Sequence, residues 1–486
     1  MRSSPSADIS SSDADAYKVD VSAFLAQVLF TKVGSEKPKS ILKSKKKSKY
    51  KDPDIPPPWL GLDQVCEEQR EAFWDAEWKE IEGILKSNAC IPITIDEVPE
   101  GVKVVDSLTL RSEKKNGPNK GKKKVRVVEH GGQQEEGTHF DQCHAPTIQV
   151  VSLRGLIAAA AALDGKVLPS GEKVKTKMRG GDFPQAYLNA DKDIVTYMWP
   201  PKSAPQYTED GKRIVWKVPK ALYGGKPSGR YWYNHLKGKL ATYGFTPTEW
   251  DPCVFKRVRE DGHFYFLGVY VDDTIHVYSD DAEFEELNAN LKRDFLGYTD
   301  LGPLTEIFNA EVAETDTHIT ISQQRYIEDL AKRFLNGESV KVHTPAESEG
   351  PNELNKLVRE AVESTSDVDP ELRSEYRAVV GALLYVALVS RPDVACAVGL
   401  LSRALEKPTP SLMSAALRVL QYLDTYKVLG IRYCKGGPTK LHGMSDSDWA
   451  VIKSTSGYVF FMACAAVAYL SKQQKSIAMS STERRS

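Results

Sequence analysis

The sequence is poor in cysteine. Its 486 residues include only seven, at positions 66, 90, 143, 253, 396, 434 and 464, and no two of them form a CxxC pair. The odd number and wide spacing disfavour a disulfide scaffold, and no Cys/His cluster indicates a zinc site. We therefore expect a reducing, intracellular environment.

Long apolar segments are also missing. The longest apolar runs, Leu156–Leu163 and Val459–Leu470, are shorter than the roughly 18–20 residues that cross a bilayer. The polar N-terminus, MRSSPSADISSSDADAY, lacks the apolar stretch of a signal peptide. The sequence predicts a soluble protein without a membrane partner, and it leaves open whether the protein resides in a cytoplasmic particle or in the nucleus.

Net charge is nearly absent, because 65 Lys and Arg residues face 66 Asp and Glu residues, for a net charge of −1. An even spread of these charges would disfavour a nucleic-acid partner. The spread is uneven: Lys37–Lys51 holds eight lysines, and Arg111–Arg126 holds eight basic residues and a single acid, Glu113. Both stretches are candidates for contact with phosphates, although a solubilising arm explains the first equally well.

Periodicity and turn residues predict a multi-domain α+β protein, and the length suggests two to four domains. A strongly turn-forming centre, Asn116–Asn119, makes the second basic stretch a predicted hairpin. The expected helices are Glu67–Lys86, Val151–Leu163, 322–336, Tyr376–Leu405 and Pro410–Tyr426, and the expected strand pair is Phe264–Tyr270 with Thr274–Tyr278.

Adjacent carboxylates stand at the joint of this strand pair. Asp272 and Asp273 follow the apolar run Phe264–Tyr270 directly, where desolvation and mutual repulsion both cost free energy. A divalent cation would remove both penalties, and Mg²⁺ commonly takes one or two carboxylates together with phosphate oxygens. Taken alone, the pair is equally compatible with an ordinary Asp-rich turn.

A third carboxylate, Asp182, ends another short strand-like run. If the strands that end at Asp182 and Asp272 lie side by side, their carboxylates can bind two metal ions about 3.5–4 Å apart. That geometry serves in-line displacement at phosphorus, because one ion activates the attacking oxygen and the other stabilises the leaving oxygen.

Around these carboxylates the sequence resembles a known family. Tyr270-Val271-Asp272-Asp273 resembles the YxDD box of reverse transcriptases, and its surroundings resemble copia-type LTR retrotransposons. The resemblance covers roughly Trp59 to Ser486. Further blocks agree in order and spacing, at Gln133–Pro146, Lys220–Tyr233, Ser322–Ile327, Tyr376–Tyr385 with Ser390–Asp393, and Lys453–Tyr458.

The resemblance implies a multi-domain α+β fold, a right-hand polymerase followed by a helical connection and a truncated ribonuclease H-like β segment. The implied division is a disordered basic tail (1–58), fingers (59–177), palm with the catalytic aspartates (178–312), thumb-like helices (313–345), a polar linker (346–369), the helical connection (370–436) and the ribonuclease H-like segment (437–486). The length is too short for a whole polyprotein, which indicates a fragment, a processed piece or a decayed copy.

Among the carboxylates, the resemblance implies that Asp182 and Asp272 bind metal, with the backbone carbonyl of Phe183 in the same shell. Asp273 would be an auxiliary catalytic carboxylate, since neighbouring side chains on a strand point to opposite faces. The implied cofactor is a pair of Mg²⁺ ions, with Mn²⁺ as a possible substitute.

For the nucleotide, the resemblance implies that Tyr187 is the aromatic gate that excludes a ribose 2′-hydroxyl. Lys124 and Arg126 match the basic pair that grips the triphosphate. A plain core tyrosine and generic solvated charge are the respective alternatives. A Gln that the family usually carries in the LYG block is replaced by Pro227, which cannot donate the same hydrogen bond.

The implied reaction is attack of a primer 3′-hydroxyl on a deoxynucleoside triphosphate, templated by RNA and yielding DNA. A decayed copy that only binds nucleic acid is the main rival, and a two-metal nuclease is a remote one. Asp446 matches the first ribonuclease H carboxylate and Glu483 belongs to the same remnant, but Arg485 stands where the family has a second Glu. We expect no ribonuclease H activity, because a cation at a ligand position opposes Mg²⁺ binding. The oligomeric state stays open.

Overall fold

The computed structural model describes residues 67–113, 121–337, 340–347, 350–447 and 454–474. The predicted tail 1–58, the centre of the basic hairpin at Asn116–Asn119, and Glu483 therefore lie outside the described residues. Within the described part, no helix combines the length and the apolar character needed to cross a bilayer.

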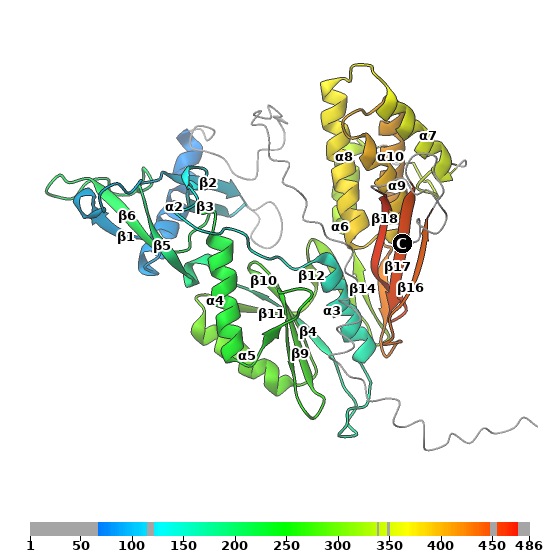
Figure 1. Ribbon diagram of the computed structural model, residues 1–486, viewed down its shortest axis with the longest axis horizontal. Coiled ribbons are helices and arrows are strands. Elements are labelled where there is room, and N and C mark those ends of the chain that lie inside the picture. Colours follow the sequence, from blue (N-terminus) through cyan, green and yellow to red (C-terminus); the bar gives the residue numbers. More distant parts are fainter. Residues whose placement is uncertain (1–66, 114–120, 338–339, 348–349, 448–453, 475–486) are drawn as a thin grey trace, which may run out of the picture.

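A six-stranded antiparallel sheet forms the middle of the molecule (Figure 1). Its strand order is β11-β4-β10-β9-β8-β7. The predicted strand pair is confirmed as β9 and β10, which are antiparallel neighbours. The strands are β4 (Lys177–Asp182), β7 (Thr246–Pro247), β8 (Val254–Val258), β9 (Phe264–Tyr270), β10 (Asp273–Tyr278) and β11 (Thr299–Pro303).

Helices cover both faces of this sheet. On one face, α4 (Ser228–Thr242) and α5 (Asp281–Asp294) enclose an aromatic core that includes Phe183 and Trp232. The other face is covered by α3 (Val150–Leu163), the predicted Ala-rich helix, whose residues Ala158–Ala162 are fully buried. Small side chains let α3 approach both this sheet and the C-terminal strands, so the core beneath the sheet runs on into the C-terminal half.

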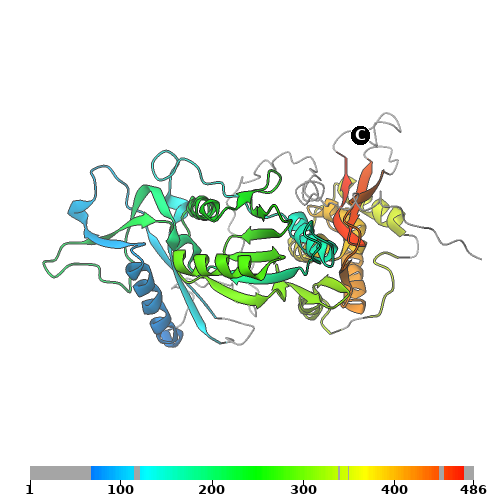
Figure 2. The ribbon, with the colours of Figure 1, turned by 90° about the horizontal axis from the view of Figure 1, so that it is seen from below.

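The elements at the other end of the molecule share a separate core (Figure 2). The predicted helix is confirmed as α2 (Glu67–Lys86), and the basic hairpin is confirmed as the antiparallel pair β2 (Ser107–Glu113) and β3 (Lys123–Glu129). Beside them lies a three-stranded sheet of order β1-β6-β5, made of β1 (Ile91–Thr94), β6 (Ile214–Lys220) and β5 (Asp191–Met198).

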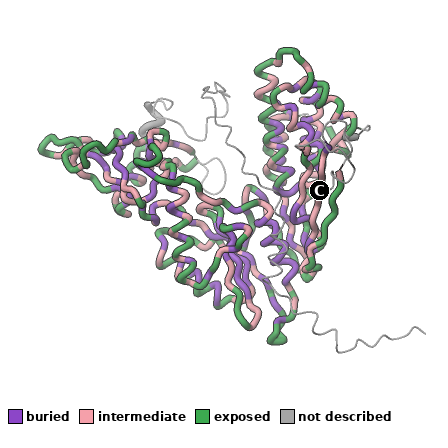
Figure 3. The backbone as a smooth tube through the Cα atoms, in the orientation of Figure 1, coloured by how far each residue is buried: buried purple, intermediate pink, exposed green. Residues whose placement is uncertain are grey.

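The C-terminal half combines two sheets with a helical bundle that has its own buried core (Figure 3). The helices are α6 (Gln324–Phe334), α7 (Gly350–Glu363), α8 (Pro370–Val389), α9 (Ala395–Leu401) and α10 (Pro410–Thr425). The strands are β12 (Glu306–Ile307), β13 (Ala310–Glu314), β14 (His318–Ser322) and β15 (Gly430–Cys434) in one sheet, and β16 (His442–Ser447), β17 (Thr455–Met462) and β18 (Ala465–Gln473) in the other.

Local structure corrects two expectations. The segment 346–369 is not simply a polar linker, because α7 buries Leu354, Val358 and Ala361 in the bundle core. A narrow apolar stripe among many polar residues hid this helix in the sequence. The single helix expected over Tyr376–Leu405 is broken between α8 and α9, next to Pro392, since a proline and the residue before it both resist helical geometry.

Tertiary pairing also differs from the expected division of the chain. The segment 313–345 contains strand β14 as well as helix α6, and β15, from the segment 370–436, pairs with β14. Helix α3, from the segment 59–177, packs under the central sheet, whereas β5 and β6, from the segment 178–312, belong to the outer sheet. These exchanges arise from pairing between residues far apart in sequence, which local patterns do not encode.

Candidate active site

The strands that carry the predicted carboxylates lie side by side. In the register of β4 and β10, Asp182 is directly opposite Asp273, so the strand ends that carry the carboxylates meet. The next residues are linked as well, because the Phe183 amide donates to the Asp272 carbonyl at 2.8 Å. Asp182, Asp272 and Asp273 are thus gathered at one end of the central sheet.

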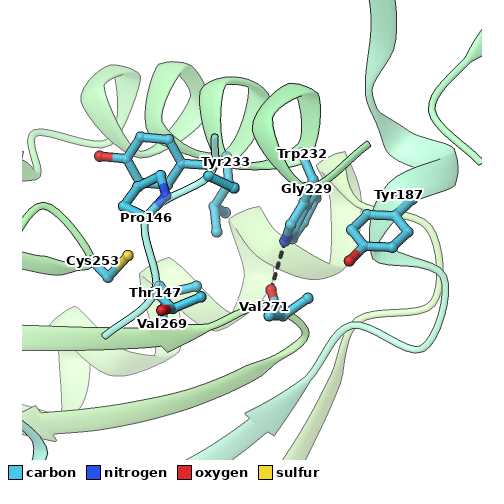
Figure 4. A pocket seen from close by; sticks show the side chains of 11 residues that line it. Pro146, Thr147, Tyr187, Gly229, Trp232, Tyr233, Cys253, Val269 and Val271 are labelled. Atoms are coloured by element: carbon cyan, nitrogen blue, oxygen red, sulfur yellow. Dashed lines mark hydrogen bonds between the residues drawn. The ribbon is translucent and has the colours of Figure 1, made fainter. Parts of the chain in front are cut away.

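The tip of the β9–β10 hairpin has a specific backbone conformation. Val271 has a φ of 57°, which is a strained value for a β-branched residue. Its carbonyl accepts a hydrogen bond of 2.6 Å from the indole Nε1 of Trp232 on α4 (Figure 4). This hydrogen bond from α4 therefore fixes the backbone of the turn that carries Asp272.

The electrostatics of this tip are unfavourable to a further negative charge. Partial burial, followed by the charges of Asp272 and Asp182, raises the pKa of the Asp273 carboxyl to about 6. The side chain is still accessible to solvent, so the raised pKa reflects both a crowded surface and two nearby carboxylates.

The donor set suits a hard divalent cation. Within the described residues, no group of three or more His, Cys, Asp or Glu side chains is arranged to hold a metal ion by itself. Mg²⁺ commonly takes only one or two protein carboxylates and completes its shell with substrate phosphate and water. Asp182 and Asp272 fit that mode, and the Phe183 carbonyl, which accepts from the Ala186 amide at 3.0 Å, is the neighbouring backbone oxygen. The Phe183 ring itself is buried in the aromatic core.

Tyr187 lies close to the carboxylates. It belongs to a short 3₁₀ segment (Ala186–Asn189) directly after β4, and its pKa is raised by burial and by the charge of Asp272. Its ring packs against that of Tyr223, with centroids 5.1 Å apart. Both rings are half-buried, which leaves Tyr187 one accessible side next to the hairpin tip.

The basic pair is connected to this tip through Tyr223. The Arg126 guanidinium lies over the Tyr223 ring, 4.8 Å from its centroid, and the charge of Asp272 contributes to raising the pKa of Tyr223 to about 12, after burial. Sequence reasoning assigned Tyr223 no role, although it stands within the LYG block. Lys124 lies two residues before Arg126 on the same strand, so both side chains point to the same face of β3.

A carboxylate already contacts this basic pair. Glu80 on α2 accepts from Arg126 at 3.0 Å, and burial raises the pKa of Glu80 while the charges of Arg126 and Lys124 lower it. Arg111, in the same basic stretch, is 4% exposed and forms an ion pair with Glu77. The Arg111 side chain is therefore too buried to contact a phosphate. It no longer counts among the candidate phosphate contacts of the Arg111–Arg126 stretch.

An apolar cavity of about 160 Å³ opens beside the tip, between α4, β9 and the segment 145–147 (Figure 4). Tyr187, Trp232 and Val271 all contribute to its wall. The predicted ribonuclease H carboxylate is not part of this region. Asp446 is exposed on β16, in the C-terminal sheet and away from β4 and β10 (Figure 1).

Carboxylates thus meet at the ends of neighbouring antiparallel strands, and an aromatic pair links this tip to a basic strand. A family model described as "Reverse transcriptase (RNA-dependent DNA polymerase)" matches residues 93–348, more than half of the chain. The chain belongs to this family.

The relatives are copia-type Pol polyproteins, which confirms the resemblance seen in the sequence. The chain is 30% identical over 425 residues to the Pol polyprotein of transposon TNT 1-94 from Nicotiana tabacum, covering 85% of this chain and 30% of the relative. It is 32% identical over 365 residues to the Pol polyprotein of transposon RE1 from Arabidopsis thaliana, covering 74% of this chain and 23% of the relative. The chain thus spans less than a third of either polyprotein.

Two further likenesses differ in coverage. A transposon Ty5-1 protein of Saccharomyces cerevisiae is 29% identical over 302 residues, which is 61% of this chain and 93% of that protein. Among solved structures, a foamy viral protease-reverse transcriptase in complex with double-stranded DNA has 12% identity and a TM-score of 0.40, covering 84% of this chain and 58% of that one.

Proposed function

We propose that this chain is the RNA-directed DNA polymerase module of a copia-like retrotransposon. The reaction is attack of a primer 3′-hydroxyl on the α-phosphate of a deoxynucleoside triphosphate, with release of pyrophosphate. The observation that carries the proposal is the register of β4 and β10, which puts Asp182 and Asp273 opposite one another with Asp272 at the adjoining turn. Template RNA, primer and DNA product are the expected partners.

In this proposal Asp182 and Asp272 hold two divalent cations, with the Phe183 carbonyl in the same shell. When bound, Mg²⁺, or Mn²⁺ in its place, supplies neutralising charge for the triphosphate and the attacking oxygen. Asp273 is the auxiliary carboxylate, whose pKa is raised by partial burial and by the charges of Asp272 and Asp182.

The nucleotide lies between the hairpin tip and strand β3. Tyr187 faces the sugar and excludes a 2′-hydroxyl, while Arg126 and Lys124 bind the triphosphate by charge-assisted hydrogen bonds. Support comes from the continuous contact from Arg126 through Tyr223 to Tyr187. Positioning and charge neutralisation, rather than covalent chemistry, then account for the rate.

The ribonuclease H-like segment is inactive in this proposal. Asp446 is exposed on β16, and Arg485 stands where the family has a second Glu. Pure protein that hydrolyses an RNA/DNA hybrid, with loss of that activity in Asp446→Asn, would show the segment to be active.

Primer extension on an RNA template tests the polymerase proposal. Asp272→Asn should lower extension by at least about 100-fold relative to wild type, because one metal-holding charge is lost at the reacting phosphate. Asp316→Asn, an exposed Asp in the turn between β13 and β14, is the matched control and should extend primers as wild type does. Equal extension by wild type and Asp272→Asn would refute the proposal and favour a copy that only binds nucleic acid.

A further inference from the structure

Trp232 contacts the chain next to both metal-binding carboxylates. Its indole N–H donates to the carbonyl of Val271, the residue immediately before Asp272, at 2.6 Å (Figure 4). Its ring packs edge-on against Phe183, the residue immediately after Asp182, with centroids 5.0 Å apart. A single side chain on α4 therefore touches the ends of β4 and β9.

The Val271 contact acts on a strained turn. A β-branched residue at φ 57° is held there only when its surroundings determine the conformation. The indole N–H has no acceptor capacity and can only donate, so it holds the carbonyl in one orientation. The following carbonyl, that of Asp272, is held by the Phe183 amide at 2.8 Å. The carbonyls of two successive residues at the tip thus accept hydrogen bonds, one from Trp232 and the other from Phe183, which packs against the Trp232 ring.

Burial makes this arrangement rigid. Trp232 is 2% exposed and Phe183 is 1% exposed, and both rings also pack against Phe295, at centroid distances of 5.7 and 5.1 Å. A close-packed aromatic cluster permits little displacement. Any shift of the Trp232 ring would move both Val271 and Phe183.

From these contacts we infer that Trp232 is a positioning residue that sets the separation of Asp182 and Asp272, an inference that rests on the proposed function. Trp232 acts through the backbone that presents each of them, and metal sites tolerate displacements of only about 0.5 Å.

Trp232→Phe tests the inference, because it keeps an aromatic ring against Phe183 and removes the donor to Val271. The matched control is Tyr233→Phe on the next residue of α4, which removes a hydroxyl that donates to the Pro252 carbonyl at 3.0 Å. Mn²⁺ affinity is measured by electron paramagnetic resonance on full-length protein without nucleic acid, with Asp272→Asn as the baseline.

Trp232→Phe should weaken Mn²⁺ binding about 10-fold, in line with the loss of a residue that orients a ligand. Tyr233→Phe should leave Mn²⁺ affinity unchanged. In primer extension, Trp232→Phe should lower kcat about 10-fold or more while the KM for the nucleotide stays within about twofold, since Tyr187 and Arg126 are untouched.

Mn²⁺ affinity in Trp232→Phe equal to that in Tyr233→Phe would overturn the inference, and so would a wild type that binds no more Mn²⁺ than Asp272→Asn. These results do not depend on polymerase activity, so they are distinguishable from failure of primer extension. If Trp232→Phe does not fold, Phe183→Leu serves instead. It removes the ring against which Trp232 packs beside Asp182, so Mn²⁺ binding should weaken. Unchanged binding in Phe183→Leu would contradict the inference.

Discussion

Three carboxylates share one end of the central sheet, and partial burial together with the charges of Asp272 and Asp182 raises the pKa of Asp273 to about 6. In the unfolded chain a carboxyl of this kind titrates near 3.8. Because the folded protein holds the proton more tightly, folding is favoured by protonation of Asp273, and stability falls as the pH rises from about 4 through 6.

Asp273→Asn should therefore stabilise the metal-free protein. At pH 7–8 we expect Tm to rise by about 2–4 °C, because the ionised carboxylate and its repulsion are gone and the group is exposed enough for solvent to screen part of the effect. The gain should shrink as the pH falls from about 6 to about 4, because Asp273 of the folded wild type becomes protonated over this range. Differential scanning calorimetry between pH 3.5 and 8 measures this, and a lower Tm at pH 8 would contradict it.

In the proposed function, Tyr187 is the residue that selects the sugar. Tyr187→Ala should raise the ratio of ribonucleotide to deoxynucleotide incorporation about 10-fold or more, because the ring no longer occupies the space beside the sugar. Tyr187→Phe keeps the ring and should leave the ratio near that of wild type. Single-nucleotide extension gives kcat/KM for each sugar, and an unchanged ratio in Tyr187→Ala would remove Tyr187 from this role.

Helix α2 neutralises part of the positive charge of the basic hairpin on which it packs. Glu77 and Glu80, three residues apart on one face of the helix, contact Arg111 on β2 and Arg126 on β3 respectively. Part of the positive charge seen in the sequence is thus neutralised inside the protein. Arg111 serves the packing of the hairpin, whereas Arg126, 21% exposed, can still reach a ligand.

Removing Arg111 should therefore destabilise the fold. Arg111→Met leaves the Glu77 carboxylate buried with only the Ser203 hydroxyl, which donates to it at 2.6 Å, and should cost about 3 kcal/mol of unfolding free energy. The control is Lys123→Met, which breaks an ion pair with the half-exposed Glu113 and should cost about 1 kcal/mol or less. Urea unfolding measures both variants. Equal losses of unfolding free energy would show that the buried ion pair stabilises the fold no more than the exposed one.

Helix α3 connects the central sheet with the C-terminal half. Arg154 on this helix is 1% exposed, and its Nε donates to the Val467 carbonyl of β18 at 2.7 Å. Its Nη1 donates to the Leu388 carbonyl near the end of α8, and its guanidinium lies over the Tyr469 ring at 4.3 Å. One buried side chain thus bonds to two elements more than 230 residues away in sequence.

Arg154→Met should loosen this connection. The Val467 carbonyl would lose its Arg154 donor and the Leu388 carbonyl would keep only the Tyr469 hydroxyl at 3.1 Å, at a cost of about 2–5 kcal/mol. Unfolding should then separate into two calorimetric transitions in place of one. Arg377→Met, which removes an exposed ion pair between α8 and Glu406, should keep one transition near the wild-type Tm. A single unshifted transition in Arg154→Met would contradict the coupling.

The local sequence pattern was sufficient to predict those elements whose own residues show a clear periodicity or motif. The apolar run Phe264–Tyr270 and the acidic joint that follows it predicted the β9–β10 hairpin, and the order of short motifs predicted the family that the comparisons confirm. Both depend on neighbouring residues alone. The same information did not reveal helix α7, because its three buried side chains are a small minority of its residues.

Contacts between segments that are distant in sequence could be identified only from the tertiary structure. The sequence supplied Asp182 and Asp272, but their adjacency depends on the pairing of β4 with β10, and the hold of Trp232 on Val271 joins residues 39 apart. The pairing of Arg111 with Glu77 likewise turned a predicted phosphate contact into a packing residue. Side-chain type and spacing are local and can be read from the chain. Register, burial and charge pairing depend on which distant segments meet, and that is set by the packing of the whole fold.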